Sequence, residues 1–333
     1  MRDWTRPYPP RLALLICALL AGLIFSTWPV QAGDWLVLPF ANQSDEPALD
    51  WLGEGFAISL EEHLRSGGQA AVPYDETREL LSKWNVPRGQ AVTLATALKA
   101  AEITGVSRVV TGSFTVAAGK LSVDTMVLDP LGPEVLGEVH EDIPLGNLFD
   151  LHAGLARAVW RAGRKKMPSF RPFDQTVEAL PVTAYERYIR ARLEADPGKR
   201  LKDLRKAAAS FPTYALLQYR LAEALDEAGK QDEALNTLAR LHPARFLLTP
   251  EAYLVEGELR FRDEDPVAAE QAVLAALEIQ DSAHGRLLHA EILLKRGLED
   301  QARSELERSR KLGLADEEYE ALSIRMDAAD NER

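Results

Sequence analysis

Residues 213–241 contain two short amphipathic helices separated by a turn, and this unit recurs through the second half of the chain. The turn residue Gly229 has a counterpart at Gly297, and Ala234 has one at Ala302, each 68 positions later, which is two periods of 34. A helical hairpin of this size cannot bury its apolar stripe alone, so it needs neighbouring copies. The period therefore predicts an all-α array of stacked hairpins.

A period of 34 built from helix–turn–helix units resembles the tetratricopeptide repeat family. About four units are visible, at 181–212, 215–246, 250–281 and 283–314, followed by an acidic terminal helix. Small residues let paired helices approach closely at Ala222, Ala234, Gly257 and Ala269. The third unit departs from the pattern, because Glu264 stands where the turn glycine is expected, and the first has Ala195 there. The resemblance implies a role in binding proteins or peptides.

The first helices of the units carry two aligned columns of residues. The position after each small residue holds Glu223, Glu258 and Glu291, and the position four earlier holds Tyr185, Tyr219, Leu254 and Leu287. In tetratricopeptide proteins, which these units resemble, such positions line a concave groove. A groove of this composition would suit a peptide in which Lys or Arg alternates with apolar anchors. The alternative interpretation is that Glu, a good helix former, recurs on a solvated face.

Residues 33–165 predict a separate α+β domain, which makes the chain multidomain. We expect strands at 34–40 and 70–74, a three-strand antiparallel meander at 108–116, 120–129 and 134–142, and helices at 49–64, 76–84, 93–104 and 148–163. Residues 166–181 contain three prolines and little periodicity, so they predict a linker to the array at 182–333. We therefore expect the two halves to fold as separate units.

Several short patterns mark this domain, namely Pro39-Phe40-x-Asn42, Trp51-Leu52-x-Glu54-Gly55, Gly105-Val106 with Gly112-Ser113, and the closing helix at Phe149. Together they resemble the TolB amino-terminal-type domain. The resemblance implies a fold and no catalytic residues. It makes a role in the bacterial cell envelope or in secretion assembly an expectation.

The first 32 residues have the order of a signal peptide. Arg2, Arg6 and Arg11 precede an apolar run at 12–25, and the small residue Ala32 precedes Gly33. Cleavage there predicts an exported, periplasmic protein. If the segment is not cleaved, residues 12–28 would anchor the chain in the inner membrane with the rest facing the periplasm.

No pattern of catalytic, metal-binding or cofactor-binding residues stands out. The six histidines have no metal-ligand spacing, and no phosphate-binding or nucleophile motif occurs, so we expect neither an enzyme nor a cofactor. Gly53 and Gly55 are explained by helix packing, and Trp35, Trp51, Trp84 and Trp160 by core packing. The net charge of −12 argues against nucleic-acid binding.

The sequence thus predicts a non-enzymatic, exported scaffold that binds protein partners through the groove of its repeats. The alternative is a periplasmic sensor in which the amino-terminal domain binds a small ligand. A deep apolar cavity within residues 33–163 would favour the sensor, whereas a flat surface there would favour docking.

Overall fold

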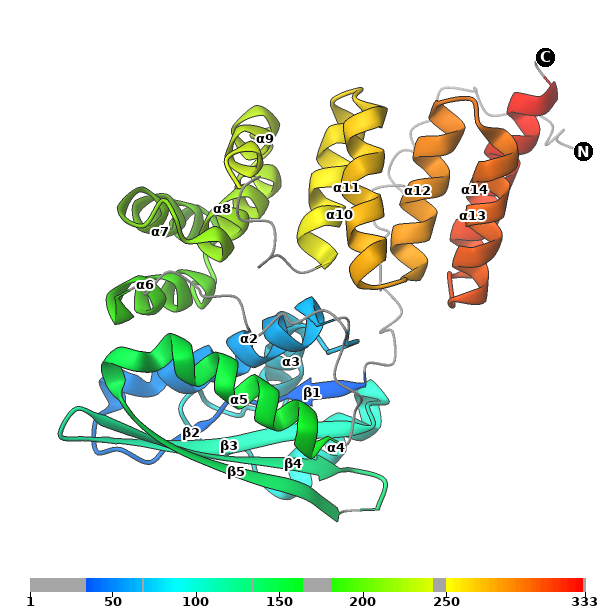
Figure 1. Cartoon of the computed structure of the whole chain (residues 1–333). Helices are drawn as coiled ribbons and strands as arrows, with labels where there is room; N and C mark the ends of the chain where they lie inside the picture. The colour runs from blue at the N-terminus through cyan, green and yellow to red at the C-terminus, as the bar shows by residue number, and fades with distance from the viewer. Residues whose placement is uncertain (1–33, 68, 133, 164–180, 242–249, 332–333) are drawn as a thin grey trace, which may run out of the picture. The chain divides into compact units, whose positions relative to one another are not determined.

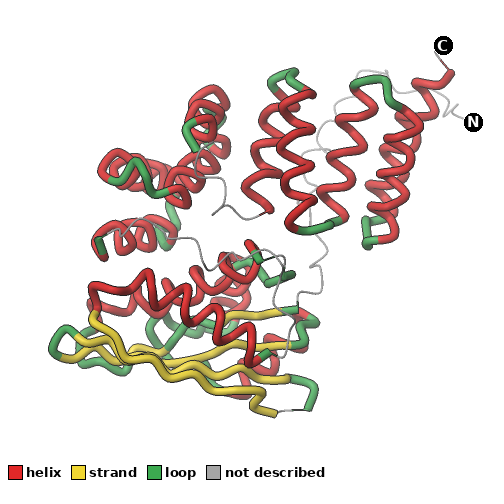
Figure 2. Tube along the Cα trace, viewed as in Figure 1, coloured by secondary structure: helices red, strands yellow, loops and turns green. Residues whose placement is uncertain are grey.

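The computed structural model describes residues 34–67, 69–132, 134–163, 181–241 and 250–331. The expected signal segment and all but the last residue of the expected linker lie outside these ranges. The described part consists of an amino-terminal domain with one sheet, followed by an array of helices joined by short loops (Figures 1 and 2). The predicted fold class, an α+β domain followed by a helical repeat array, is confirmed.

The amino-terminal sheet is built around one long strand. β3 (Arg108–Ala117) pairs in parallel with two short strands, β1 (Trp35–Val37) and β2 (Ala41–Asn42). On its other side β3 pairs antiparallel with β4 (Lys120–Asp129), which pairs antiparallel with β5 (Glu134–Pro144). The predicted meander of three consecutive strands is therefore confirmed.

Helices cover both faces of this sheet (Figure 1). α2 (Asp50–Ser66) and α5 (Leu148–Ala162) lie over one face, α4 (Leu94–Thr104) covers the other, and α3 (Tyr74–Lys83) contacts α2 and β1. The short 3-10 helices are η1 (Pro47–Leu49) and η2 (Leu145–Asn147). Successive side chains of a strand point to opposite faces, so Val110 packs in the core under α2 and α5 while Val109 packs in the core under α4.

The expected strand at 70–74 does not form. Ala71 makes only an isolated bridge with Trp35, and Tyr74 already begins α3. Pro73 has no backbone N–H to donate to a strand ladder, and it stands at the N-cap of α3 with φ −56° and ψ 141°. The proline therefore ends the extended segment and starts the helix.

The packing interpretation of the tryptophans and of the paired glycines is confirmed. Trp35, Trp51 and Trp160 are buried, and Trp84 is partly buried against the core under α4. A Cβ at Gly53 would lie 2.1 Å from the carbonyl oxygen of Phe40, so only glycine lets α2 approach the segment between β1 and β2 this closely.

The array contains four helical hairpins and a terminal helix within the described residues. The hairpins are α6 (Val182–Arg192) with α7 (Pro197–Ser210), α8 (Ala215–Glu227) with α9 (Gln231–Ala239), α10 (Pro250–Arg262) with α11 (Pro266–Ile279), and α12 (Ala283–Lys295) with α13 (Glu299–Lys311). The terminal helix is α14 (Asp316–Asn331). Leu322 and Met326 of α14 are buried in one cluster with Leu306 of α13, so α14 covers the last hairpin.

Three of the hairpin turns share one backbone conformation. Gly229 and Gly297 have φ +70° and +73°, as expected for turn glycines, and Glu264 adopts φ +59° at the equivalent turn. The left-handed region is costly for a residue with a Cβ atom, so the third turn keeps the geometry of its neighbours at an energetic cost. Gly257 allows α10 and α11 to pack closely, because a Cβ there would lie 2.7 Å from Val273 Cγ2.

The hydrophobic core continues from the amino-terminal domain into the array. Phe56 of α2 and Tyr185 and Tyr188 of α6 belong to the same buried cluster. The two domains therefore share a core at this junction. That each half folds as a separate unit stays a prediction.

Candidate partner-binding groove

The seven residues predicted to line a groove lie on α6, α8, α10 and α12, the first helices of the four hairpins. The structure divides them into two groups. The positions on α6 and α8 face α2 and α3 of the chain itself or are engaged by neighbours on their own helix. The positions on α10 and α12 surround an open hollow, apart from Leu254, which is buried.

Tyr185 is held against α2. Its side chain is 1% exposed, and its hydroxyl donates to the carbonyl oxygen of Gly55 at 2.5 Å and lies 2.7 Å from Ser59 Oγ. A Cβ at Gly55 would lie 2.8 Å from the Tyr185 hydroxyl, so this glycine makes room for the ring. Burial raises the pKa of Tyr185, which keeps the phenol protonated as a donor. Tyr185 therefore contributes to the junction between the domains and does not line an open groove.

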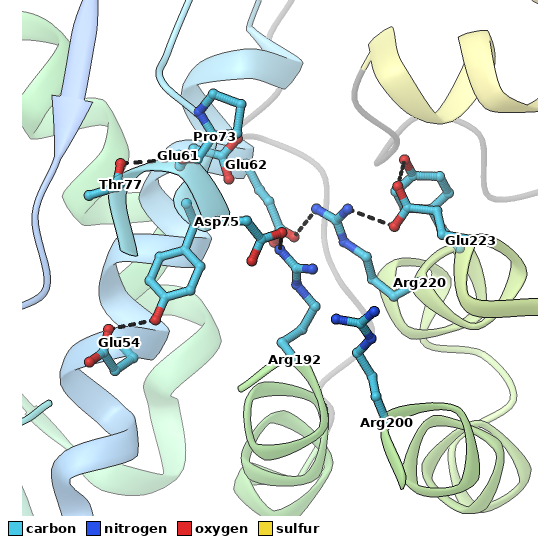
Figure 3. Close-up of polar contacts among 12 residues, drawn as sticks. Glu54, Glu61, Glu62, Pro73, Asp75, Thr77, Arg192, Arg200, Arg220 and Glu223 are labelled. Atoms are coloured by element: carbon cyan, nitrogen blue, oxygen red, sulfur yellow. Dashed lines mark hydrogen bonds and ion pairs between the residues drawn. The ribbon is translucent and has the colours of Figure 1, made fainter. Parts of the chain in front are cut away.

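A buried carboxylate of α2 ties the first two hairpins to the amino-terminal domain. Glu62 is 3% exposed, and its Oε1 accepts from the Tyr188 hydroxyl at 2.5 Å. The same oxygen accepts from Arg220 Nη2 at 3.2 Å (Figure 3). Arg220 Nη1 donates to Glu223 Oε2 at 2.7 Å, and the Tyr219 hydroxyl donates to Glu223 Oε1 at 2.5 Å. A buried charge is tolerated only when it is paired, so these groups depend on one another.

This network engages two more of the predicted groove residues. Tyr219 is 1% exposed, so its ring is covered within the chain, and both oxygens of Glu223 accept hydrogen bonds from α8 itself. A partner reaching Glu223 would have to compete with Arg220 for its carboxylate.

A second ion pair crosses the same junction from α3. Arg192 Nη2 donates to Asp75 Oδ2 at 3.1 Å, and the Arg192 side chain is 9% exposed (Figure 3). The orientation of α3 depends in turn on Glu54, whose Oε2 accepts from the Tyr74 hydroxyl at 2.6 Å. Burial raises the pKa of Glu54. The amino-terminal domain thus covers α6 and α8 with both apolar and polar contacts.

The hollow between α10 and α12 has a volume of about 270 Å³. Its lining residues are Glu258, Phe261, Arg262, His284, Leu287, Leu288 and Glu291. Three of the seven predicted residues, Glu258, Leu287 and Glu291, therefore lie around one space. Leu254 is 6% exposed and packs near Gly285, so it forms part of the interior beside the hollow.

The hollow combines two carboxylates with an apolar floor. The side chains of Glu258 and Glu291 are 38% and 29% exposed, so they stay accessible from solvent. Glu258 Oε1 lies 2.9 Å from His284 Nε2, and Glu291 Oε1 accepts from Arg325 Nη1 at 2.8 Å. The hydrogen bond to Glu258 raises the pKa of His284. A cation bound in the site would share these carboxylates with His284 and Arg325, beside leucine and phenylalanine side chains.

Sequence reasoning did not identify His284, Phe261 or Arg262 as part of this site. His284 precedes Leu287 by three positions and Glu291 by seven, which places all three on one face of α12. That spacing was a usable signal, but the histidines were considered only as metal ligands. Phe261 and Arg262 lie at the end of α10, outside the two aligned columns, so the columns did not mark them as site residues.

The described residues offer neither a metal cluster nor a membrane-spanning helix. Among them, no group of three or more His, Cys, Asp or Glu side chains could hold a metal ion. Within the same ranges, no helix combines the length and the hydropathy needed to cross a bilayer.

Comparison with known proteins gives partial structural similarity. No family model and no curated protein sequence matches the chain. A structure described as the functional characterization of pilF from Pseudomonas aeruginosa is 19% identical, covers 56% of this chain and 81% of that chain, and has a TM-score of 0.37. The LpoB C-terminal domain from Salmonella enterica is 12% identical over 38% of this chain and 93% of its own, with a TM-score of 0.26. TolB from Acinetobacter baumannii is 18% identical over 42% of this chain and 30% of its own, with a TM-score of 0.28.

Proposed function

We propose that the chain is a non-enzymatic scaffold that binds a protein segment in the hollow between α10 and α12. The observation that carries this proposal is the convergence of Glu258, Leu287 and Glu291, which lie in two aligned columns of the repeat, around one open space. The occupant that fits is a segment in which Lys or Arg stands beside an apolar side chain. The cation would meet the two carboxylates while the apolar group contacts Leu287 and Phe261.

The amino-terminal domain supports this function by covering the start of the array. End repeats of stacked hairpins expose an apolar face that needs a cap. α2 supplies that cover for α6 through Tyr185 and Tyr188. The resemblance to TolB amino-terminal-type domains and the signal-like segment support an envelope location, which is part of this proposal.

The hollow between α10 and α12 favours docking over small-ligand sensing. It is open and lined by array residues, whereas the sensor alternative placed its site in the amino-terminal domain.

The test is capture of a defined peptide. The full chain is titrated with a labelled peptide of alternating Lys and Leu, and with the same peptide carrying Glu for Lys. The variant Glu258→Gln with Glu291→Gln should weaken binding of the Lys peptide about tenfold, since each exposed charge contact contributes up to about 1 kcal/mol. The matched control is Glu317→Gln with Glu320→Gln, which removes two exposed carboxylates from α14.

The control decides between a site and a general charge effect. Binding should be unchanged within about twofold in the α14 variant, because Glu317 and Glu320 do not line the hollow and exposed charges are screened by salt. Equal weakening by both variants, or equal binding of the Glu peptide, would show that the hollow does not recognise the cationic segment.

A further inference from the structure

The α6–α7 hairpin is basic in a chain that is acidic as a whole. Residues 182–210 contain eight Lys or Arg and four Asp or Glu, whereas the chain carries a net charge of −12. Several of these cations lie on the exposed surface, including Arg187 on α6 and Lys199, Lys202 and Lys206 on α7. The first hairpin therefore presents net positive charge, whereas the second and third hairpins, at 215–239 and 250–279, carry more Asp and Glu than Lys and Arg.

A hollow of about 360 Å³ lies between the two helices of this hairpin. It is lined by Arg187, Arg190, Ala191, Asp203, Lys206 and Ala207. Ala191 and Ala207 are 2% and 1% exposed, so they form a small apolar floor. Arg187 and Lys206 approach it from opposite helices, α6 and α7. The arrangement leaves room for a short side chain between two cations.

The two cations are available to a ligand. Within the described residues, no ion pair engages Arg187 or Lys206. Arg187 Nη1 donates to Ser210 Oγ at 3.1 Å, and its guanidinium carbon lies 5.6 Å from the centre of the Phe211 ring. These contacts orient the guanidinium without neutralising it. Arg190 differs, because its Nε donates to Glu186 at 2.8 Å.

We propose that this hollow binds an acidic segment of a second partner protein. A carboxylate would lie between Arg187 and Lys206, and its short stem would contact Ala191 and Ala207. Asp203 at the edge of the hollow would repel several consecutive acidic residues, so a single Asp or Glu flanked by small apolar residues fits best. This site is separate from the α10–α12 hollow and has the opposite charge, so the chain would hold two different partners.

The observations favour an acidic peptide over an anionic membrane. Helices that bind a bilayer surface insert large apolar side chains beside their cations. The large apolar side chains exposed in the described residues are Leu94, Ile103, Leu131, Val135, Val267, Leu274, Leu312 and Ile324. None of these lies on α6 or α7, so the basic surface has cations but no apolar anchor.

The experiment uses the full chain and a fluorescein-labelled peptide of alternating Glu and Ala, with a Gln–Ala peptide of the same length as the neutral control. Fluorescence anisotropy is measured at low and moderate salt. The test variant is Arg187→Gln with Lys206→Gln. The matched variant is Lys99→Gln with Lys120→Gln, which removes two exposed cations from the amino-terminal domain. Lys206→Glu is added because it leaves the Arg187 contacts with Ser210 and Phe211 intact.

We expect the test variant and Lys206→Glu to weaken Glu–Ala binding about tenfold or more, and the matched variant to change it less than about twofold. The Gln–Ala peptide should not bind. Circular dichroism and the thermal midpoint establish that each variant is folded. Equal weakening by the test and matched variants would overturn the proposal.

Two other results would also overturn it. One is binding to vesicles of anionic phosphatidylglycerol that depends on Arg187 and Lys206 while the Glu–Ala peptide does not bind, which would make a membrane the ligand. The other is self-association, seen in sedimentation without peptide and abolished by the same variant, which would make a second copy of the chain the occupant.

Discussion

Replacing Glu264 by glycine should stabilise the array, although it removes a charged surface side chain. The turn after α10 repeats the hydrogen bond of its neighbours. The amide of Asp265 donates to Arg260 O at 3.0 Å, as Lys230 does to Leu225 O at 2.8 Å and Leu298 to Leu293 O at 2.9 Å. Two of these turns have glycine at the left-handed position, and the third has Glu264 at φ +59°.

The expected change in unfolding free energy follows from the backbone conformation at position 264. A residue with a Cβ pays about 1–2 kcal/mol in the left-handed region, and glycine loses about 0.5–1 kcal/mol of extra chain entropy on folding. The difference predicts a gain of about 0.5–1 kcal/mol for Glu264→Gly. Gly229→Ala is the matched reverse change, because a Cβ at Gly229 meets no atom within 4 Å. It should lose a similar amount through the backbone alone.

Urea unfolding of the full chain, followed by circular dichroism, measures both variants. Repeat arrays can unfold in stages, so amide exchange at Asp265 and Lys230 should be measured as well. Protection should rise at Asp265 in the first variant and fall at Lys230 in the second. A change of the same sign in both variants would refute the argument that the left-handed backbone sets the cost.

Three further predictions concern the junction and the chain start. Burial lowers the pKa of His152 to about 3, below its unfolded value near 6.5, so the stability contributed by neutral His152 is fully present above pH 6.5 and is lost as the pH falls. The unfolding free energy should drop by about 2 kcal/mol at pH 5. Urea midpoints should show a smaller drop between the two pH values in His152→Gln than in the unchanged protein. Tyr188→Phe leaves buried Glu62 with one fewer donor and should cost about 1–3 kcal/mol in unfolding free energy, whereas Arg325→Gln, an exposed pair, should cost less than about 1. Mass spectrometry of the protein recovered from cell-envelope extracts should find Gly33 as its first residue.

The elements of the fold could be predicted from local patterns. The expected strand at 120–129 has the bounds of β4, and the expected helix at 93–104 differs from α4 by one residue. Alternation and helical periodicity report which residues face a core, and they did so in both domains. The strand at 70–74 failed because Pro73 was not weighed as a ladder breaker.

The site could be predicted only in part, because a repeat pattern does not say what covers each copy. Tyr185 and Leu287 occupy the same position in their hairpins, yet one is buried under α2 and the other lines an open hollow. The difference comes from Gly55, which lies 130 positions before Tyr185 in sequence. A contact over that distance leaves no trace in the period of 34, so the closed half of the groove could not be foreseen.

The cover that α2 provides leaves the length of the array open to change. In the part of the chain that the structure describes, its polar and aromatic contacts with the array include those of Tyr185 and Tyr188 on α6 and of Arg220 on α8. Insertion of one 34-residue hairpin between α9 and α10 would leave those contacts untouched. Related chains could therefore differ in how many repeats separate the sheet domain from the binding hollow, and the spacing between the two could evolve in steps of one hairpin without rebuilding either.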